Sequence, residues 1–169
     1  PRGLHPLTAA LGDEAMREVM GRYFRLWRRA VEEHGGQVEK FIGEAVVGVF
    51  GMERAREDDP HRAVRAAIAV RPALARLAEE VRSEHGQALV TRVGIDTGEV
   101  VLGRFDERGD GDLVVVGATV NRAARLQTAA PPDGILLSAA TARHVRGAFG
   151  LQEHGDLELK GVEGTVRTF

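Results

Sequence analysis

Cysteine is absent from this chain of 169 residues, which excludes disulfide scaffolds, thiolate zinc sites and cysteine nucleophiles. Long apolar runs are also absent: no stretch approaches the roughly 18 residues of a membrane span, and no secretory leader opens the sequence. Neither charge dominates, since 23 basic residues face 25 acidic ones and the formal net charge is -2. Bulk charge therefore gives no steering towards nucleic acid. The composition, 43% hydrophobic and 28% charged, is typical of one globular domain, which we expect in the cytoplasm.

Lysine is scarce. The basic residues are 21 arginines and only two lysines, Lys40 and Lys160. A chain that uses arginine almost everywhere is expected to keep lysine where a compact, flexible ammonium is needed instead of a planar fork. Chance survival of two lysines is the alternative, and the count alone does not decide between them.

Two long segments have apolar residues at three- and four-residue spacing, which predicts amphipathic helices. The first runs from Asp13, as its N-cap, to about His34. The second begins at Asp58-Asp59-Pro60, and Pro72 should kink or break it. Two shorter helices are expected over Thr119–Gln127 and Ser138–Arg146.

Short apolar runs between turn residues predict the strands. Gln37–Ile42 and Ala45–Phe50 are joined by Gly43-Glu44, which is the spacing of a two-residue hairpin. Leu89–Ile95 and Glu99–Leu102 are expected to form a second hairpin around Asp96-Thr97-Gly98. Further strands are expected at Leu113–Val116, Ile135–Leu137, Phe149–Glu153, Leu157–Leu159 and Thr165–Phe169. This order predicts an α+β fold, with helices covering one face of a largely antiparallel sheet.

The first hairpin carries polar residues that a simple core does not require. Lys40 lies inside a strand, and Glu44 lies at the hairpin tip. A glutamate at such a tip is either a solvated side chain or a ligand for Mg²⁺, which takes one or two carboxylates together with substrate phosphate oxygens.

Three later segments also carry candidate residues. Arg92 alternates with apolar neighbours, so it is either an ordinary outward-facing strand residue or a binding residue. Asn121 and Arg125 are four residues apart and share one helix face. An amide and a guanidinium presented together suit an anionic transition state, although a plain surface pair would have the same spacing. Lys160 stands at a strand end beside a glycine.

Taken in order, these segments resemble the class III nucleotide cyclase catalytic domain, the adenylate and guanylate cyclase homology domain. The resemblance runs from about Leu11 to Phe169. Its most specific stretches are EKFIGEAVVGVFG (39–51), RVGIDTGEVVLG (92–103), GATVNRAARLQ (117–127) and the closing LKGVEG. The resemblance implies a ferredoxin-like βαββαβ-type sheet over residues 11–169. Residues 1–10 hold Pro1, Gly3 and Pro6 without helical or strand periodicity, which predicts an irregular N-terminal remnant.

The resemblance also implies an activity. Domains of this family convert a nucleoside triphosphate to a 3′,5′-cyclic monophosphate and pyrophosphate. They act as head-to-tail dimers with sites at the interface, and two metal ions, Mg²⁺ or Mn²⁺, assist the reaction. The implied roles in this chain are metal binding for Glu44, base contact for Lys40, phosphate contact for Arg92 and Lys160, and ribose orientation and α-phosphate stabilisation for Asn121 and Arg125.

Three departures from the family pattern bear on activity. The family's first metal aspartate should lie at or before Pro1–His5, which holds no carboxylate, so we expect it and the first strand to precede this chain. Glu44 stands where the family usually has aspartate, and its extra methylene predicts lower activity or a preference for Mn²⁺. Val114 occupies the base-selecting position and cannot accept a hydrogen bond from adenine. ATP is favoured over GTP, but the choice stays open, and Asp112 is near enough to test.

Two functions remain in competition. The first is a cyclase domain, making cyclic AMP within a larger protein that carries regulatory domains. The second is a pseudo-cyclase that dimerises or binds nucleotide to regulate a neighbour. A diguanylate cyclase would require Gly-Gly followed by acidic residues in the hairpin, and Gly43-Glu44-Ala45 does not supply this. The expected partners are a triphosphate and a second copy of the chain, without nucleic acid or a membrane segment.

Overall fold

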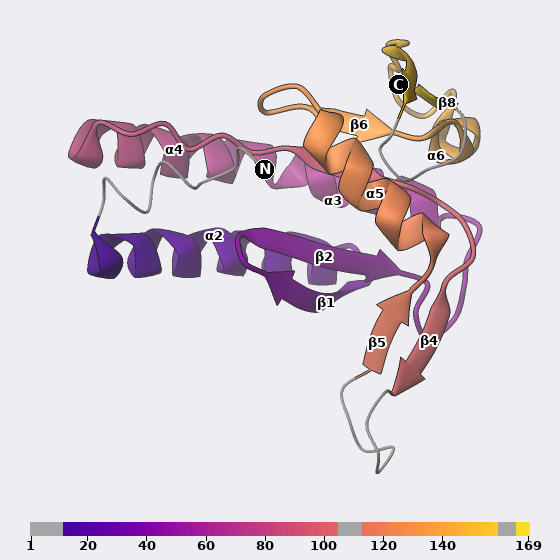
Figure 1. Cartoon of the computed structure of the whole chain (residues 1–169), viewed down its shortest axis with the longest axis horizontal. Helices are drawn as coiled ribbons and strands as arrows, with labels where there is room; N and C mark the ends of the chain where they lie inside the picture. Colours follow the sequence, from indigo (N-terminus) through magenta and orange to yellow (C-terminus); the bar gives the residue numbers. More distant parts are fainter. Residues whose placement is uncertain (1–11, 105–112, 159–164) are drawn as a thin grey trace. The chain divides into compact units, whose positions relative to one another are not determined.

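The computed structural model describes residues 12–104, 113–158 and 165–169 (Figure 1). Helices and strands are mixed along the chain, which confirms the expected combination of both. In chain order they are α2 (Asp13–Glu33), β1 (Gly36–Ile42), β2 (Ala45–Phe50), α3 (Asp59–Ala69), α4 (Arg71–His85), β3 (Val93–Ile95), β4 (Val101–Arg104), β5 (Leu113–Val116), α5 (Ala118–Ala129), β6 (Ile135–Leu137), α6 (Ala139–Val145), β7 (Gly155–Glu158) and β8 (Thr165–Thr168).

The chain divides into two compact units. The first contains the described residues up to Phe50 together with Arg62–Thr91, and the second contains Gly51–His61 together with the described residues from Arg92 onward. The described strands form four two-stranded pairs. Each unit is considered by itself below.

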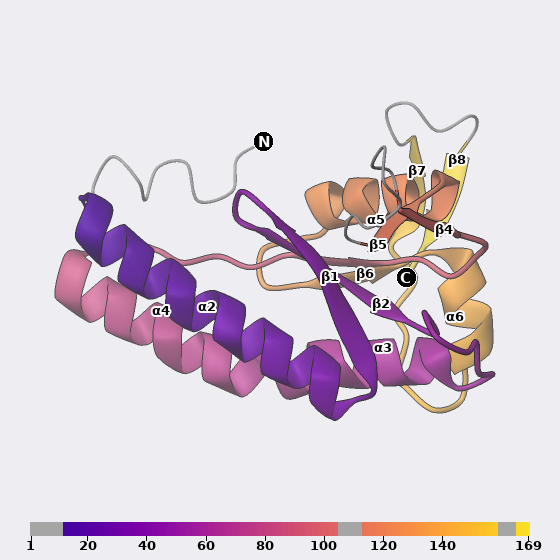
Figure 2. The same ribbon diagram turned by 90° about the horizontal axis from the view of Figure 1, so that it is seen from below.

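The first unit is built on two long helices, α2 and α4, which lie side by side (Figure 2). An ion pair between Arg22 and Glu80 joins them. The predicted break at Pro72 is confirmed, because α3 ends at Ala69 and Pro72 lies in the first turn of α4. Backbone N–H groups in the first turn have no hydrogen-bond partner within the helix, so proline is tolerated there. The apolar faces bury Met16, Val19, Met20, Tyr23, Trp27, Ala30 and Val31 of α2 and Leu74, Leu77 and Val81 of α4.

The first predicted hairpin is also confirmed. β1 and β2 pair antiparallel, with Ile42 opposite Ala45, so that Gly43 and Glu44 alone form the turn. Gly43 has a φ of 58°, a left-handed conformation that favours glycine. The helix start was predicted less well, because the N-cap of α2 is Gly12 and Asp13 is the first helical residue.

In the second unit the pairing of strands differs from the second predicted hairpin. β3 pairs in parallel with β6, and β4 pairs antiparallel with β5. Asp96 and Thr97 therefore do not join a hairpin, and their side chains are hydrogen-bonded to Arg122 and Thr141 farther along the chain. The prediction was wrong because the partner strands, β6 and β5, lie outside the segment 89–102. Turn residues indicate only which strands adjacent in sequence pair, and they say nothing about pairing with strands farther along the chain.

The helix α5 packs directly against β3 and β6. A Cβ atom added at Gly94 of β3 would lie 2.2 Å from the backbone nitrogen of Gln127 and 2.3 Å from the carbonyl oxygen of Ala123. Only glycine therefore allows the backbones of β3 and α5 to approach this closely. Beside this contact, Leu126, Ala130 and Leu136 form a buried apolar cluster, with Leu157 and Val166 packed against it.

The C-terminal part of the second unit is held by α6 and the β7–β8 pair. Ser138 caps α6 by accepting a hydrogen bond from the backbone N–H of Thr141 at 3.2 Å. The strand predicted over Phe149–Glu153 is wrong: only an isolated bridge between Arg146 and Phe149 forms there. Within the described residues, no helix combines the length and the apolar character needed to cross a bilayer.

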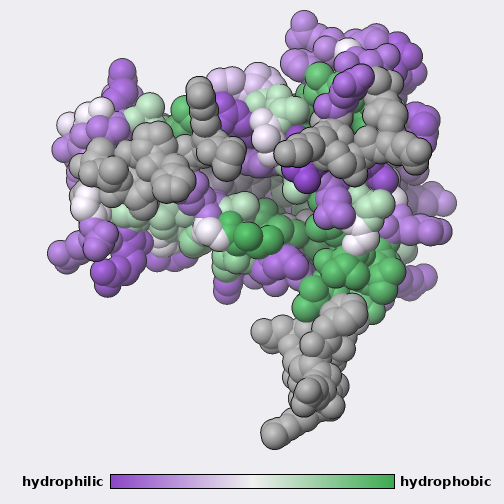
Figure 3. Space-filling view, in the orientation of Figure 1, coloured by the Kyte–Doolittle hydropathy of each residue, from purple (hydrophilic) through white to green (hydrophobic). Residues whose placement is uncertain are grey.

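Exposed apolar side chains gather on the β4–β5 pair. Val101 is 60% exposed, Leu102 40% and Val116 39%. Figure 3 shows hydrophobic surface in the region of this strand pair. Large apolar residues left in water at neighbouring positions are characteristic of surfaces that bind another protein.

Candidate functional site

In the first unit, the β1–β2 hairpin places Lys40 beside a buried carboxylate. The Lys40 Nζ lies 3.0 Å from Oε1 of Glu39, whose side chain is only 2% exposed, whereas that of Lys40 is 34% exposed. The two residues are adjacent in sequence, and a register shift of the hairpin falls between Val38 and Lys40. An irregularity of this kind changes the direction of side chains in a strand. Here it lies beside the ion pair between the half-exposed Lys40 and the buried Glu39.

Glu44 lies in the turn of the same hairpin and is half-buried. Burial raises the pKa of the Tyr23 phenol above its ordinary value, and the negative charge of Glu44 raises it further. The helix α2, which carries Tyr23, packs against both strands of the hairpin. Lys40 and Glu44 thus belong to one hairpin supported by α2.

The donor set for a metal ion is small. In residues 12–104, 113–158 and 165–169, no group of three or more His, Asp or Glu side chains is arranged to hold an ion. Glu44 offers one half-buried carboxylate. One carboxylate fits the chemistry of a Mg²⁺ ion that takes its other ligands from water and substrate phosphates. A metal pair held entirely by protein side chains does not fit the described residues.

In the second unit, α5 presents Asn121 and Arg125 on one exposed face. The opposite side of this helix buries Thr119 and Leu126, so that the amide and the guanidinium both face solvent. Gly117 precedes the helix with a φ of 141°, a conformation that other residues rarely adopt. The predicted sharing of one face by Asn121 and Arg125 is confirmed, and their chemical roles stay a prediction.

Two other predicted residues of this unit, Arg92 and Val114, lie outside α5. Arg92 donates a hydrogen bond from Nε to the carbonyl oxygen of Ala130 at 2.9 Å, which satisfies a carbonyl at the C-terminal end of α5. Val114 is half-buried on β5 opposite Gly103 and offers only an isopropyl group. Their roles at the phosphates and at the base stay predictions. Lys160 and Asp112 lie outside the described residues.

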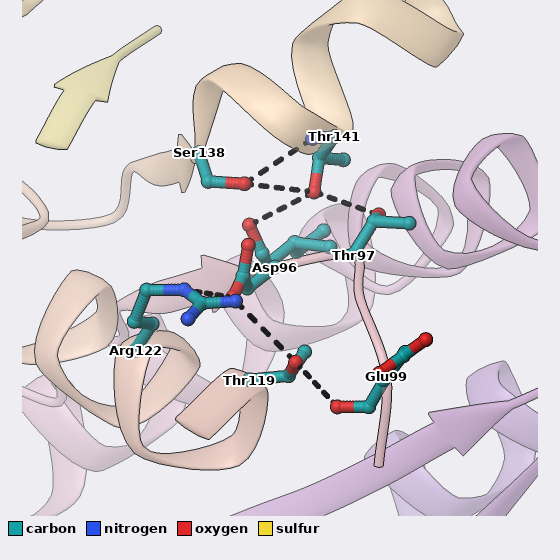
Figure 4. Close-up of polar contacts among 8 residues, drawn as sticks. Asp96, Thr97, Glu99, Thr119, Arg122, Ser138 and Thr141 are labelled. Carbon is teal, nitrogen blue, oxygen red and sulfur yellow. Dashed lines mark hydrogen bonds and ion pairs between the residues drawn. The ribbon is translucent and has the colours of Figure 1, made fainter. Parts of the chain in front are cut away.

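A polar network behind α5 was missed by the sequence reasoning (Figure 4). Arg122 donates from Nε to Oδ2 of Asp96 at 2.7 Å, and the side chain of Asp96 is 1% exposed. Thr119 donates to the carbonyl oxygen of Glu99 at 2.7 Å. The available signal was a carboxylate directly after an apolar strand and an arginine directly after Asn121, but nothing local to either residue pairs them.

The predicted residues thus fall into two groups, one in each unit. The first unit brings Lys40 and Glu44 onto one hairpin, and the second brings Asn121 and Arg125 onto one helix face. The positions of the two units relative to each other are not determined, so each group is described in its own unit.

Comparison with known proteins shows that the chain is similar to nucleotide cyclases in sequence and in fold. The chain is 27% identical over 130 residues to the adenylate cyclase of Anabaena cylindrica, covering 75% of this chain and 25% of that protein. Among solved structures, it is similar to the adenylyl cyclase CyaB from P. aeruginosa, with a TM-score of 0.91, 27% identity and coverage of 99% of this chain and 87% of that one. The guanylyl cyclase Cya2 gives a TM-score of 0.84 at 28% identity, covering 99% and 85%.

These similarities confirm the expected nucleotide cyclase fold. The chain spans well under half the length of the first curated relatives that it matches. The family described as the adenylate and guanylate cyclase catalytic domain matches residues 4–169. The chain therefore belongs to the family of adenylate and guanylate cyclase catalytic domains.

Proposed function

We propose that this chain is the catalytic domain of a nucleotidyl cyclase that converts a nucleoside triphosphate, with ATP favoured, to a 3′,5′-cyclic nucleotide and pyrophosphate. One observation carries the proposal: in a member of the cyclase family, α5 presents Asn121 and Arg125 together on one exposed helix face. A guanidinium and an amide held in this way suit a phosphoryl group that gains negative charge in the transition state.

The proposed reaction is an intramolecular displacement at the α-phosphorus. The ribose 3′-oxygen forms a bond to this phosphorus and loses its proton to solvent water. The bond to the oxygen bridging to the β-phosphate breaks, which releases pyrophosphate. Arg125 donates hydrogen bonds to the α-phosphate oxygens, and Asn121 orients the ribose. Lys40 contacts the base, while Arg92 and Lys160 bind phosphate oxygens. Positioning and charge stabilisation supply most of the acceleration in phosphoryl transfer.

Glu44 is the described residue that would bind a divalent cation. Its carboxylate would contribute one ligand to Mg²⁺ or Mn²⁺, with other ligands from the triphosphate. When bound, the metal would neutralise triphosphate charge and favour deprotonation of the 3′-hydroxyl. Glutamate has one methylene more than the aspartate that is usual at this position in the cyclase family, so its carboxylate extends farther from the backbone. Mg²⁺ tolerates such a displacement of a ligand less than larger ions do.

Dimerisation and nucleotide binding are properties of related cyclase domains, and we extend both to this chain. A homodimer would let the hairpin residues of one copy and the α5 residues of the other act on one nucleotide. The exposed apolar side chains of β4 and β5 support self-association. We also propose that the chain acts in intracellular signalling, as part of a longer protein with regulatory domains.

The decisive experiment measures cyclic nucleotide formation by the intact protein. ATP and GTP are each supplied with Mg²⁺ or Mn²⁺, and cyclic AMP and cyclic GMP are quantified. We expect cyclic AMP, more with Mn²⁺ than with Mg²⁺, and a loss of roughly a hundredfold or more in Arg125→Ala, as when a transition-state donor is removed. Glu44→Asp should raise the rate with Mg²⁺ relative to Mn²⁺. No cyclic nucleotide from either substrate with either ion would contradict the proposal.

A second candidate is a pseudo-cyclase that binds nucleotide without turnover. Val114 favours it, because its isopropyl group cannot read the base by hydrogen bonding. The described residues also contain no group of three or more His, Asp or Glu side chains arranged to hold a metal ion, which favours it as well. Triphosphate binding without product, unchanged by Glu44→Asp, would favour this function over catalysis.

A further inference from the structure

The segment after β3 is joined to α5 by an ion pair that the proposed chemistry does not use. Arg122 Nε and Asp96 Oδ2 are 2.7 Å apart. Arg122 Nη2 also lies 3.4 Å from the hydroxyl of Thr119, which itself donates to the carbonyl oxygen of Glu99. Figure 4 shows these contacts running from the loop after β3 to the first turns of α5.

Burial makes this ion pair unlike a surface pair. The Asp96 side chain is 1% exposed and Arg122 is 30% exposed. The second oxygen of Asp96, Oδ1, is also buried and has no hydrogen-bond partner among the described residues. Among the described residues, Arg122 is the ion-pair partner of Asp96, and a buried carboxylate that loses such a counter-charge is strongly destabilised. Rotation or retreat of α5 would break this contact, so the ion pair resists both.

The same contact sets the direction of the proposed catalytic face. Successive residues of an α-helix are separated by about 100° around the axis. Arg122 directly follows Asn121, so fixing the Arg122 side chain against Asp96 fixes the direction in which Asn121 and Arg125 project. The helix is also held at constant depth, because Gly94 lets its backbone rest on β3.

We propose that Asp96 is a positioning residue for the cyclase reaction. Through Arg122 it fixes the rotation of α5 about its axis, and thereby the presentation of Asn121 and Arg125 to the ribose and the α-phosphate. Asp96 does not itself touch the nucleotide. This inference rests on the proposed cyclase function and adds to it a residue whose effect is on orientation.

The test compares Arg122→Gln and Arg122→Lys in the intact protein. Arg122→Gln removes the counter-charge, and we expect kcat to fall by about ten- to a hundredfold with KM changed less than about threefold, as for a misoriented group at a reacting centre. Arg122→Lys keeps the charge and should restore most of the lost kcat. The matched control is Arg167→Gln, which breaks an exposed pair with Glu153 in the same unit, at 2.6 Å and 58% and 53% exposure. It should keep kcat within about twofold, as exposed pairs contribute little.

A second measurement does not depend on activity. Backbone hydrogen exchange of α5 in the nucleotide-free protein should be faster in Arg122→Gln than in wild type, and unchanged in Arg167→Gln. Thermal unfolding of each variant gives the folded fraction at the assay temperature, against which kcat is corrected.

The outcomes separate this inference from the proposed function. An active wild type with unchanged kcat in Arg122→Gln overturns the inference, as does a loss that only follows the folded fraction or is not restored by lysine. An inactive wild type overturns the proposed function and the positioning role with it. In that case faster exchange of α5 in Arg122→Gln would still show that the ion pair restrains the helix.

Discussion

At the scale of single residues, the two hairpin carboxylates are in contrasting surroundings. Glu39 is almost fully buried against Lys40, whereas Glu44 lies in the turn and is half-buried. A carboxylate removed from water is a poor candidate for a ligand of Mg²⁺, because an ion that keeps water and substrate phosphates as its other ligands needs an accessible carboxylate. The contrast thus favours Glu44 over Glu39 as the metal-binding group, although both lie on the same short hairpin.

Tyr23 gives a prediction about pH at this scale. Burial holds the pKa of its phenol above the ordinary value, and the charge of Glu44 adds to this. Below about pH 10 the phenol is protonated in both the folded and the unfolded chain, so its contribution to stability is fully present. As the pH rises further, the unfolded chain loses the proton first, and stability falls until the folded pKa is passed.

The measurement is the denaturant midpoint of unfolding between about pH 9 and 11, in wild type and in Tyr23→Phe, with a chelator present. Tyr23 is the only tyrosine of the chain, so wild type should lose more stability over this interval than Tyr23→Phe. Equal losses in the two proteins would show that the phenol ionises equally easily in the folded and unfolded chains.

At the scale of elements, local signals predicted what local forces decide. The β1–β2 hairpin was predicted because Gly43-Glu44 fixes both the turn and the register. The pairings of β3 with β6 and of β4 with β5 were not predicted, because they join segments separated by loops or by a whole helix. The candidate site divides in the same way: Asn121 and Arg125 share a face through helix periodicity alone, whereas the Asp96–Arg122 pair exists only once the second unit has folded.

Gly94 gives a prediction at this scale. In Gly94→Ala the new methyl group would overlap the backbone of α5 at Gln127 and Ala123, and neither atom belongs to a flexible side chain. We expect the free energy of unfolding, measured by chemical denaturation, to fall by about 1–3 kcal/mol, the usual cost of overpacking.

Gly150→Ala is the matched control for this substitution, because a Cβ at that position would meet no atom within 4 Å from the described residues beyond its chain neighbours. It should leave stability unchanged or slightly raised, since alanine restricts the unfolded chain. A Gly94→Ala variant as stable as this control would mean that α5 does not rest on β3 as described.

At the scale of the whole molecule, the exposed apolar side chains of β4 and β5 bear on assembly. Val101, Leu102 and Val116 lie on two strands that pair with each other. Burying such a surface against a second copy would remove it from water, which favours association. The mixed charge of the chain, with a formal net value of -2, would oppose this only weakly.

We therefore expect a concentration-dependent dimer in sedimentation velocity experiments, weakened at least about tenfold by Val101→Asp, because a carboxylate would have to be desolvated at the interface. Gln152→Asp adds the same charge at an exposed position of the same unit and should leave the dimer unchanged. Equal association of wild type and Val101→Asp would show that the β4–β5 surface is not where the copies meet.

The close seating of α5 on Gly94 also has a mechanical consequence. Where backbone rests on backbone, no layer of side chains lies between the two elements to yield under load. A displacement that tilts β3 would therefore move α5 by nearly the same amount, because the two backbones are in direct contact at Gly94. A control signal that reached this strand could then swing the guanidinium of Arg125 without rearranging a single rotamer on the helix.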